Sequence, residues 1–434
     1  MKTDLFTLPN GLRVFLIDTK AFPTLTTLLI VGAGSRYEQE ANNGVAHFLE
    51  HMFFKGSKKY PDPFTLTSTI EQLGGIWNAF TSKDYTGYFI KATSEHFNVV
   101  IDVLSDVLLH PLFKEEEIEK EKGVIVEEIN MYEDMPQSLV GDLYENLLYK
   151  GNPLGFDVIG TKKTVTSFNK QTFLDYRGQL YHPKNAVLVV AGGLTQGKRE
   201  GFTIQDYVKG IEEKFGEWGN GAKSEFIPMS ENQEKPQIFI KNKKTEQAHF
   251  CLGYRTFSSN DKRKKPLEVL TAILGVGASS KLFMELREKR GLCYYISTGL
   301  QYYHDVGNMV TQAGVPKDVV KVTEAMKLTL EEHQKMLKDG FTKKDITKAK
   351  EILKGRLLLS MEDSFNVAHF YGKKAVLETK TESPQEVVDQ IEKVTDEEIH
   401  AVAQDVIQSS HLNIAAIGPF EEKDFEKIIK YIIV

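Results

Sequence analysis

Apolar positions in the first 215 residues alternate between strand-like runs and segments with helical spacing. The run from Leu25 to Val31 predicts a buried strand, and 97–109 predicts an amphipathic helix. Residues 76–81 and 86–91 predict two strands joined at Ser82-Lys-Asp, and 186–193 predicts a strand that ends in a glycine pair. The first half is therefore expected to combine a sheet with long helices.

The order of these elements begins again after residue 236. A weaker set of matching segments comprises a strand at 248–254, a helix at 265–274, a strand pair at 291–301 and 306–312, and a helix at 318–330. The segment 218–236 between the two sets is rich in glycine, proline and polar residues and shows no period, which favours a linker. The pattern predicts two related α+β halves, at 1–217 and 237–434.

Composition narrows the class of protein. A length of 434 residues predicts two to three domains, and the net charge of −6 argues against a nucleic-acid-binding surface. The chain has only two cysteines, Cys251 and Cys293, which favours a reducing compartment and excludes a cysteine-rich metal site. No apolar run reaches the roughly 18 residues of a membrane span. The N-terminus has strand–turn–strand character rather than that of a signal peptide, so a cytoplasmic protein without a membrane partner is expected.

The segment His47-Phe-Leu-Glu50-His51 is the strongest chemical signal in the sequence. On a helix, two histidines four residues apart lie on one face and can bind the same metal ion. Glu50 lies in the same arc and can take a proton from a metal-bound water. His-x-x-Glu-His is the inverted zincin motif. For an isolated pair, the alternative is that both histidines are hydrogen-bonded inside a hydrophobic core. A third ligand is therefore needed to support a metal site.

The acidic segment 115–132 is the candidate region for that ligand. At about 100° per residue, one helical face carries an apolar stripe of Ile118, Ile125, Ile129 and Tyr132, with Val124 at its margin. Glu121 and Glu128 fall inside this stripe, whereas Glu127 points to the opposite side. Carboxylates on an apolar face need a partner, and a metal ion or a metal-bound histidine is a good one. Glu128 is thus the candidate ligand and Glu121 the candidate support of a ligand, although Gly123 permits a kink and a solvated acidic face is the alternative.

Together these segments resemble the pitrilysin-type inverzincin family of zinc peptidases, in the short subgroup of the mitochondrial processing peptidase and its bacterial relatives. The metal-binding helix of that family matches 44–56, and its second glutamate motif matches 121–128. The segment from Asn78 and Ala79 to Tyr88 matches the family's edge strand, which pairs with the substrate backbone, and 181–192 matches a late strand. The resemblance implies an antiparallel-rich sheet covered by helices in each half, the two halves forming half of a clamshell.

In the second half, 279–294 resembles the family's Arg/Tyr segment, with Arg287 and Tyr294 seven residues apart. The resemblance implies that these two side chains reach the substrate and the scissile carbonyl. It favours a homodimer in which they serve the zinc of the other subunit, while a heterodimer with a related chain stays open. Tyr295 competes with Tyr294 for the role, and ordinary structural roles for Arg287, Tyr294 and Asn78 are the alternatives.

The function implied is a zinc-dependent endopeptidase that cleaves short or unstructured polypeptides inside a dimeric chamber. One Zn²⁺ per chain would be held by His47, His51 and Glu128, with Glu50 as the base. The alternative is a structural subunit of the same fold that is catalytically silent or depends on a partner chain. That alternative is typical of members that have lost part of the metal motif, and this sequence retains all of it.

Overall fold

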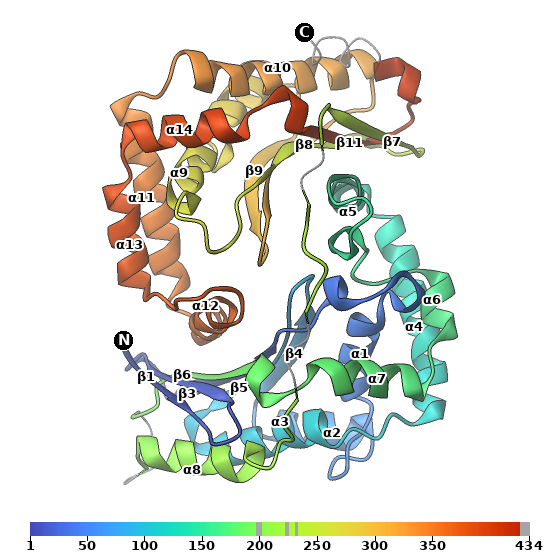
Figure 1. The fold of residues 1–434 in the computed structure, drawn as a ribbon, viewed down its shortest axis with the longest axis vertical. Coiled ribbons are helices and arrows are strands. Elements are labelled where there is room, and N and C mark those ends of the chain that lie inside the picture. Colours follow the sequence, from blue (N-terminus) through green and yellow to red (C-terminus); the bar gives the residue numbers. More distant parts are fainter. Residues whose placement is uncertain (197–201, 222–224, 231–232, 426–434) are drawn as a thin grey trace. The chain divides into compact units, whose positions relative to one another are not determined.

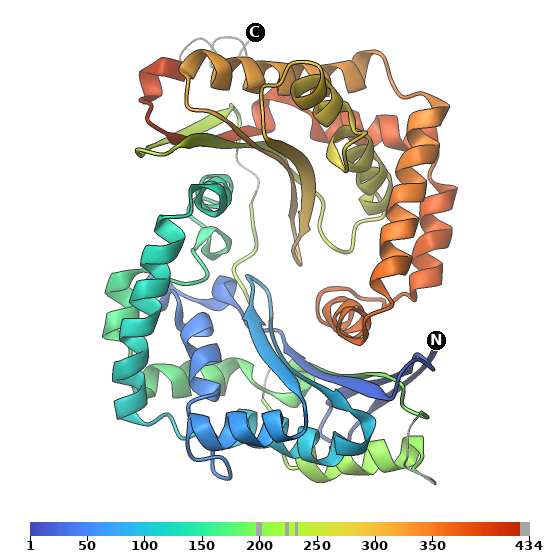
Figure 2. The same ribbon diagram turned by 180° about the vertical axis from the view of Figure 1, so that it is seen from behind.

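The computed structural model describes residues 1–196, 202–221, 225–230 and 233–425. Contacts divide the chain into two compact units, shown as ribbons in Figures 1 and 2. Unit 1 comprises Met1–Ile129, Phe156–Ile227 and Leu359–Glu382. Unit 2 comprises Asn130–Gly155, Pro228–Leu358 and the chain from Ser383 onward. Among the described residues, the helices are all too short or too polar to cross a membrane.

Unit 1 is built on a six-stranded sheet with the order β1-β2-β6-β3-β5-β4. The β2 and β6 strands are parallel, and the other neighbouring pairs are antiparallel. One edge of the sheet is β4, next to β5 (Figure 1). The strands are β1 (Lys2–Thr7), β2 (Arg13–Asp18), β3 (Thr24–Val31), β4 (Ile76–Thr81), β5 (Thr86–Thr93) and β6 (Ala186–Gly192).

Helices cover both faces of this sheet, because the central strands are apolar on both sides. One face packs in a core with α1, α2, α3, α4, α7 and α8, and the other packs against α12 (Figure 1). The helices of the first part of the chain are α1 (Val45–Phe53), α2 (Pro63–Gln72), α3 (Phe97–Leu109), α4 (Glu115–Glu133), α5 (Pro136–Leu148), α6 (Lys162–Ser167), α7 (Lys170–Leu180) and α8 (Ile204–Phe215).

Unit 2 repeats the same topology in a five-stranded sheet with the order β7-β11-β8-β10-β9. Its β7 and β11 strands are parallel, as β2 and β6 are, and the remaining pairs are antiparallel. The strands are β7 (Gln237–Asn242), β8 (Gln247–Thr256), β9 (Tyr295–Tyr302), β10 (Gly307–Pro316) and β11 (Leu412–Gly418). The helices of the second part are α9 (Lys264–Gly275), α10 (Val319–Lys338), α11 (Lys343–Ser360), α12 (Ser364–Leu377), α13 (Pro384–Lys393) and α14 (Asp396–Val406).

The structure confirms the predicted α+β class with two related sheets covered by helices. Two helices, however, pack on the sheet of the other half of the sequence. Helix α5 packs against β8 and β11 within unit 2, and α12 packs against β3 and β6 within unit 1. The domain boundaries predicted from the sequence, at residues 217 and 237, remain a prediction. Within the predicted linker, 222–224 and 231–232 lie outside the described residues.

Candidate metal centre

Helix α1, which carries His47, Glu50 and His51, begins after Gly44, which has no side chain to accept a capping hydrogen bond. Gly44 has φ +96°, and a Cβ there would lie 2.7 Å from the carbonyl oxygen of Ile159. The buried carboxylate of Glu38 takes the place of a capping side chain, because it accepts from the backbone N–H groups of Gly44 and Ala46 at 2.8 Å each. A carboxylate at this end also complements the helix dipole.

His47, His51 and Glu128 come together in unit 1, with one ligand atom from each lying within 4.8 Å of the others. The Nε2 atoms of both histidines lie 3.7 Å from Oε2 of Glu128. Ligand atoms bound tetrahedrally at about 2.0–2.1 Å are roughly 3.3 Å apart, so the two histidine–glutamate separations would need to shorten only slightly. Two imidazoles and one carboxylate are also the donor set of a catalytic zinc site with an open position. The residues present therefore fit a divalent metal ion.

Helix α4 presents Glu128 to the histidines because its apolar side packs in the core of unit 1. Ile125 and Ile129 are buried there, while Glu127 is exposed. The predicted stripe is wrong at its margins, since the side chains of Val124 and Tyr132 are 51% and 38% exposed. Helical phase gives the direction of these two side chains but not how far neighbouring elements bury them.

Glu121 holds the ring of His51 through Nδ1, the ring nitrogen that does not face Glu128. His51 Nδ1 donates to Glu121 Oε1 at 2.8 Å, and Lys55 Nζ lies 2.6 Å from the second oxygen of the same carboxylate. The Glu121 side chain is only 4% exposed, yet these two cationic partners outweigh its burial and lower its pKa. The bond at Nδ1 leaves Nε2 of His51 directed to the metal position. In the described part of the chain, the buried Nδ1 of His47 has no such partner.

The electrostatics keep one histidine neutral and ready to bind a metal. Burial, followed by the charge of His51, lowers the pKa of His47 to about 3. Burial also acts to lower the pKa of His51, but the hydrogen bond to Glu121 and the surrounding carboxylates raise it overall. Burial raises the pKa of Glu128, and the charge of Glu121 adds to that effect. These carboxylates therefore concentrate negative charge where a cation would bind.

Glu50 lies beside this cluster and is held by strand β4. Thr81 Oγ1 donates to Glu50 Oε2 at 2.5 Å. Burial raises the pKa of Glu50 despite this hydrogen bond and the nearby His51. A carboxylate whose pKa is raised, and which has one oxygen anchored, suits the role of a group that accepts and returns a proton.

The β4 edge presents two faces beside this centre. Thr81 contacts Glu50, and the ring of Trp77 packs at a tilt against that of Phe54 at the end of α1, with ring centroids 4.4 Å apart. Because side chains alternate along a strand, Ala79 lies on that same face. Asn78 points to the other face and is exposed, and its Oδ1 accepts from the N–H of Ala79 at 2.9 Å.

Arg287 and Tyr294 belong to unit 2, and the structure brings these two side chains together. Arg287 lies in a π-helical turn, Phe283–Glu288, with its guanidinium carbon 4.8 Å from the ring centroid of Phe283 and 5.4 Å from that of Tyr294. Tyr294 is 72% exposed. Tyr295, the competing tyrosine, is half-buried and hydrogen-bonded to His249 at 3.0 Å. Of the two, Tyr294 is therefore the one with a solvent-accessible ring beside Arg287.

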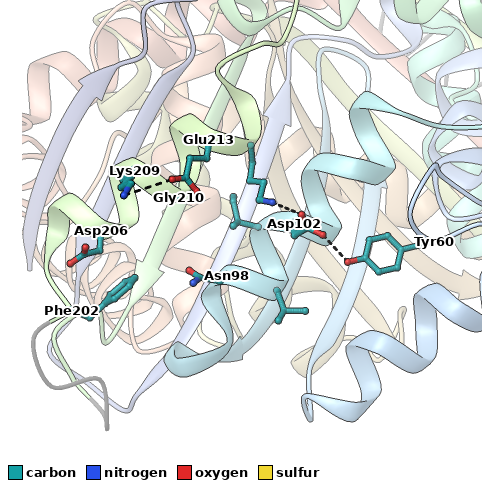
Figure 3. A pocket seen from close by; sticks show the side chains of 11 residues that line it. Tyr60, Asn98, Asp102, Phe202, Asp206, Lys209, Gly210 and Glu213 are labelled. Atoms are coloured by element: carbon teal, nitrogen blue, oxygen red, sulfur yellow. Dashed lines mark hydrogen bonds and ion pairs between the residues drawn. The ribbon is translucent and has the colours of Figure 1, made fainter.

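A cavity of about 530 Å³ lies elsewhere in unit 1, between α3 and α8. Asp102 contacts Lys214 there at 2.5 Å, and it accepts from the hydroxyl of Tyr60 at 3.0 Å (Figure 3). Lys209 and Glu213 form a looser pair at 4.0 Å. None of the residues predicted for the metal centre lines this cavity. It is therefore separate from the chemistry described above.

Sequence reasoning missed three residues of the centre, Glu38, Lys55 and Thr81. Lys55 could have been found, because it lies four residues after His51 and so continues the face of the two histidines. Thr81 could have been found by alternation from Ala79. Glu38 carries no local signal, since its contact with the start of α1 depends on the path of the intervening loop.

Comparison with known proteins gives consistent matches along the chain. Residues 13–162 match the insulinase family (Peptidase family M16), and residues 167–353 match the Peptidase M16 inactive domain. An uncharacterized zinc protease of Bacillus subtilis, YmxG, is 33% identical over 95% of this chain and 98% of its own length. An uncharacterized zinc protease of Streptomyces coelicolor is 31% identical over 97% of this chain and 91% of its own.

Solved structures share the fold at lower identity. A protease from Helicobacter pylori has a TM-score of 0.88 at 22% identity, covering 96% of this chain and all (100%) of its own. A chain of Complex III2 from Candida albicans has a TM-score of 0.82 at 18% identity, covering 99% of this chain and 100% of its own.

Proposed function

This chain belongs to peptidase family M16, and from that premise we propose that it is a zinc-dependent endopeptidase. The observation that carries the proposal is the convergence of His47, His51 and Glu128 beside a buried, anchored Glu50. The relatives in Bacillus subtilis and Streptomyces coelicolor bear the name of zinc proteases, which supports zinc as the metal.

One Zn²⁺ per chain would be held by His47, His51 and Glu128, and it would supply a Lewis acid that activates water and polarises the peptide carbonyl. Glu121 would hold the His51 ring in the orientation that presents Nε2, with Lys55 fixing the other oxygen of Glu121. The loss of such a support for a ligand weakens metal binding in other metalloproteins by about 10–100-fold.

Glu50 would act as the general base and then as the general acid. Its carboxylate accepts a proton from the attacking water as the oxygen bonds to the carbonyl carbon. Glu50 then donates that proton to the amide nitrogen as the carbon–nitrogen bond breaks, so that a free amine leaves. Thr81 holds one carboxylate oxygen, which leaves the other for the proton.

The substrate would be a short or unstructured polypeptide that adds a strand to the β4 edge. Main-chain groups of β4 near Asn78 and Ala79 would pair with it, and the side chain of Asn78 would first release the Ala79 N–H that it now covers. Side chains of the peptide would then alternate between the face of Thr81 and the opposite face. An exposed edge strand is a known template for such pairing.

Arg287 and Tyr294 would bind the substrate backbone and the oxyanion. In the described part of the chain, Arg287 has no carboxylate partner, whereas the neighbouring Lys289 and Arg290 both contact Glu285. By the family resemblance we propose a homodimer that closes like a clamshell, in which these residues serve the zinc of the other subunit.

The test is cleavage of unstructured peptides of mixed length by the zinc-loaded chain, with fragments identified by mass spectrometry. Glu50→Gln should abolish cleavage while still binding zinc, and Glu127→Gln, on the exposed side of α4, should behave like the wild type. Substantial cleavage by Glu50→Gln would remove Glu50 from the role of base. Size-exclusion chromatography with mass measurement on the same sample tests the homodimer.

The second candidate is a structural or partner-dependent subunit. One solved structure with this fold belongs to Complex III2 from Candida albicans, and this likeness supports the second candidate. No cleavage by the wild type despite stoichiometric zinc would favour it over the peptidase.

A further inference from the structure

Residues Gly34–Glu38, which we name the strap, run along the turn between β4 and β5. The N–H groups of Ser35 and Arg36 donate to the carbonyl oxygens of Ser82 and Lys83 at 3.2 and 3.0 Å. A Cβ at Gly34 would lie 2.3 and 2.4 Å from those same two oxygens, so only glycine permits this approach. The strap is therefore bound closely to the end of the strand that we propose pairs with substrate.

A buried ion pair reinforces this attachment. Arg36 Nη1 lies 3.0 Å from Oδ1 of Asp84 in the same turn, and the two side chains are 0% and 2% exposed. A buried charge is tolerated only when it is paired, and removing one partner would leave the other charge buried and uncompensated. The position of the Arg36 guanidinium is thus tied to the position of the β4–β5 turn.

The far end of the strap is attached to the metal helix. Glu38, two residues after Arg36, accepts from the N–H groups of Gly44 and Ala46 at the start of α1. It also accepts from the side-chain amide of Asn43 at 2.9 Å. His47 is the next residue after Ala46. Five residues of chain therefore connect the β4–β5 turn to the helix that carries both histidines.

Phe226, from the segment predicted as a linker, covers the strap. Its ring centroid lies 3.8 Å from the guanidinium carbon of Arg36, and the ring of Tyr37 packs edge-on against it at 6.0 Å and 88°. All of these residues belong to unit 1, and the chain enters unit 2 at Pro228. An aromatic face over a desolvated guanidinium is a favourable contact in its own right.

We propose that Phe226 is a positioning residue for the active site. By covering Arg36 it fixes the strap, and the strap fixes helix α1 against strand β4, so that metal ligands and substrate strand keep their spacing. The inference rests on the proposed function for its catalytic part only. The segment 218–236 would then be more than a spacer, because one of its side chains is a structural part of the metal centre's support.

The experiment compares Phe226→Ala with Phe226→Trp, which keeps an aromatic face, and with Ile227→Ala, an exposed neighbour. Hydrogen exchange at the Ser35 and Arg36 amides reports the strap directly. Chelator competition measures zinc affinity, and peptide cleavage measures kcat/KM. Phe226→Ala should speed exchange at both amides and weaken zinc binding and kcat/KM, each by about 2- to 30-fold, the value of a cation–π contact. Phe226→Trp and Ile227→Ala should resemble the wild type.

Unchanged exchange at Ser35 and Arg36 in Phe226→Ala, or an equal change in Ile227→Ala, would overturn the proposal. Faster exchange with unaltered zinc affinity and unaltered cleavage would also overturn it, because the strap would then be merely structural. If the wild type cleaves nothing, the proposed function fails, while exchange and zinc affinity still decide whether Phe226 positions the metal helix.

Discussion

Replacing Glu38 by glutamine should remove a specific pH dependence from the stability of unit 1. Burial raises the pKa of the Glu38 carboxyl to about 7, against the opposing effect of its N–H donors and of Lys83. Tyr176, the other titratable group that acts on it from α7, stays neutral because burial raises its own pKa far above the usual range. Glu38 is therefore the group of this cluster that changes charge between weakly acidic and neutral pH.

The direction of this pH dependence follows from proton binding at Glu38. Between about 4.5, the ordinary pKa, and about 7, the folded state binds more protons at Glu38 than the unfolded state does. The stability that Glu38 contributes is thus fully present below about 4.5, falls as the pH rises, and levels off above about 7. A difference of about 2.5 in pKa corresponds to about 3 kcal/mol, at about 1.4 kcal/mol for each pKa unit.

The chain offers a direct probe, because both of its tryptophans, Trp77 and Trp218, lie in unit 1. Urea unfolding followed by tryptophan fluorescence, with a chelator present, gives the free energy of unfolding of that unit from pH 4.5 to pH 8. The wild type should lose about 3 kcal/mol relative to Glu38→Gln across this range. Glutamine cannot ionise, and every other titrating group is the same in the two proteins, so the difference between their free energies of unfolding isolates Glu38. A difference that stays constant with pH would refute the reasoning.

Three further outcomes are expected. Gly44→Ala should lower the free energy of unfolding by about 2–4 kcal/mol in urea titrations, because a non-glycine residue at φ +96° is strained and its Cβ meets backbone atoms. Glu121→Gln should weaken zinc binding by about 10–100-fold in chelator competition, whereas Glu127→Gln should not. A chelator should abolish cleavage and lower the melting temperature of unit 1, and zinc at 100 times its Kd should restore both, with about 2.7 kcal/mol of stabilisation.

Local periodicity was enough to predict most elements of the fold. Residues 97–109 were expected to form a helix and form α3 over Phe97–Leu109, and 76–81 form β4 as expected. The repeat of strands in the second half also appears, in the same sheet order. The packing of α5 and α12 could not be predicted, because an apolar helix face specifies that it is buried and not which of two similar sheets buries it.

The residues of the metal centre also divide into those that the local sequence places and those that tertiary packing places. His47, Glu50 and His51 are placed by one helix, so their spacing in sequence sets their spacing in space. Glu128 follows from helical phase once the core side of α4 is known. Thr81 and Glu38 reach α1 from a strand edge and from a loop, and such contacts depend on tertiary structure that no local pattern encodes.

The comparison of the two units explains why, among the described residues, the metal cluster lies in unit 1. In α1, the three residues that escape full burial are His47, Glu50 and His51. Helix α9 follows β8 in chain order as α1 follows β3, and it is buried along its whole length except at Lys265 and Glu268, which pair with each other at 3.0 Å. A metal site that acts on a peptide needs ligands with one side open to solvent, and α9 has no such face. Consistently, the described part of the chain contains one cluster able to hold a metal ion, and it lies in unit 1. The two units thus share a sheet topology, but α9 contains no histidine and is almost fully buried, so it lacks the partly exposed ligands on which the chemistry of α1 depends.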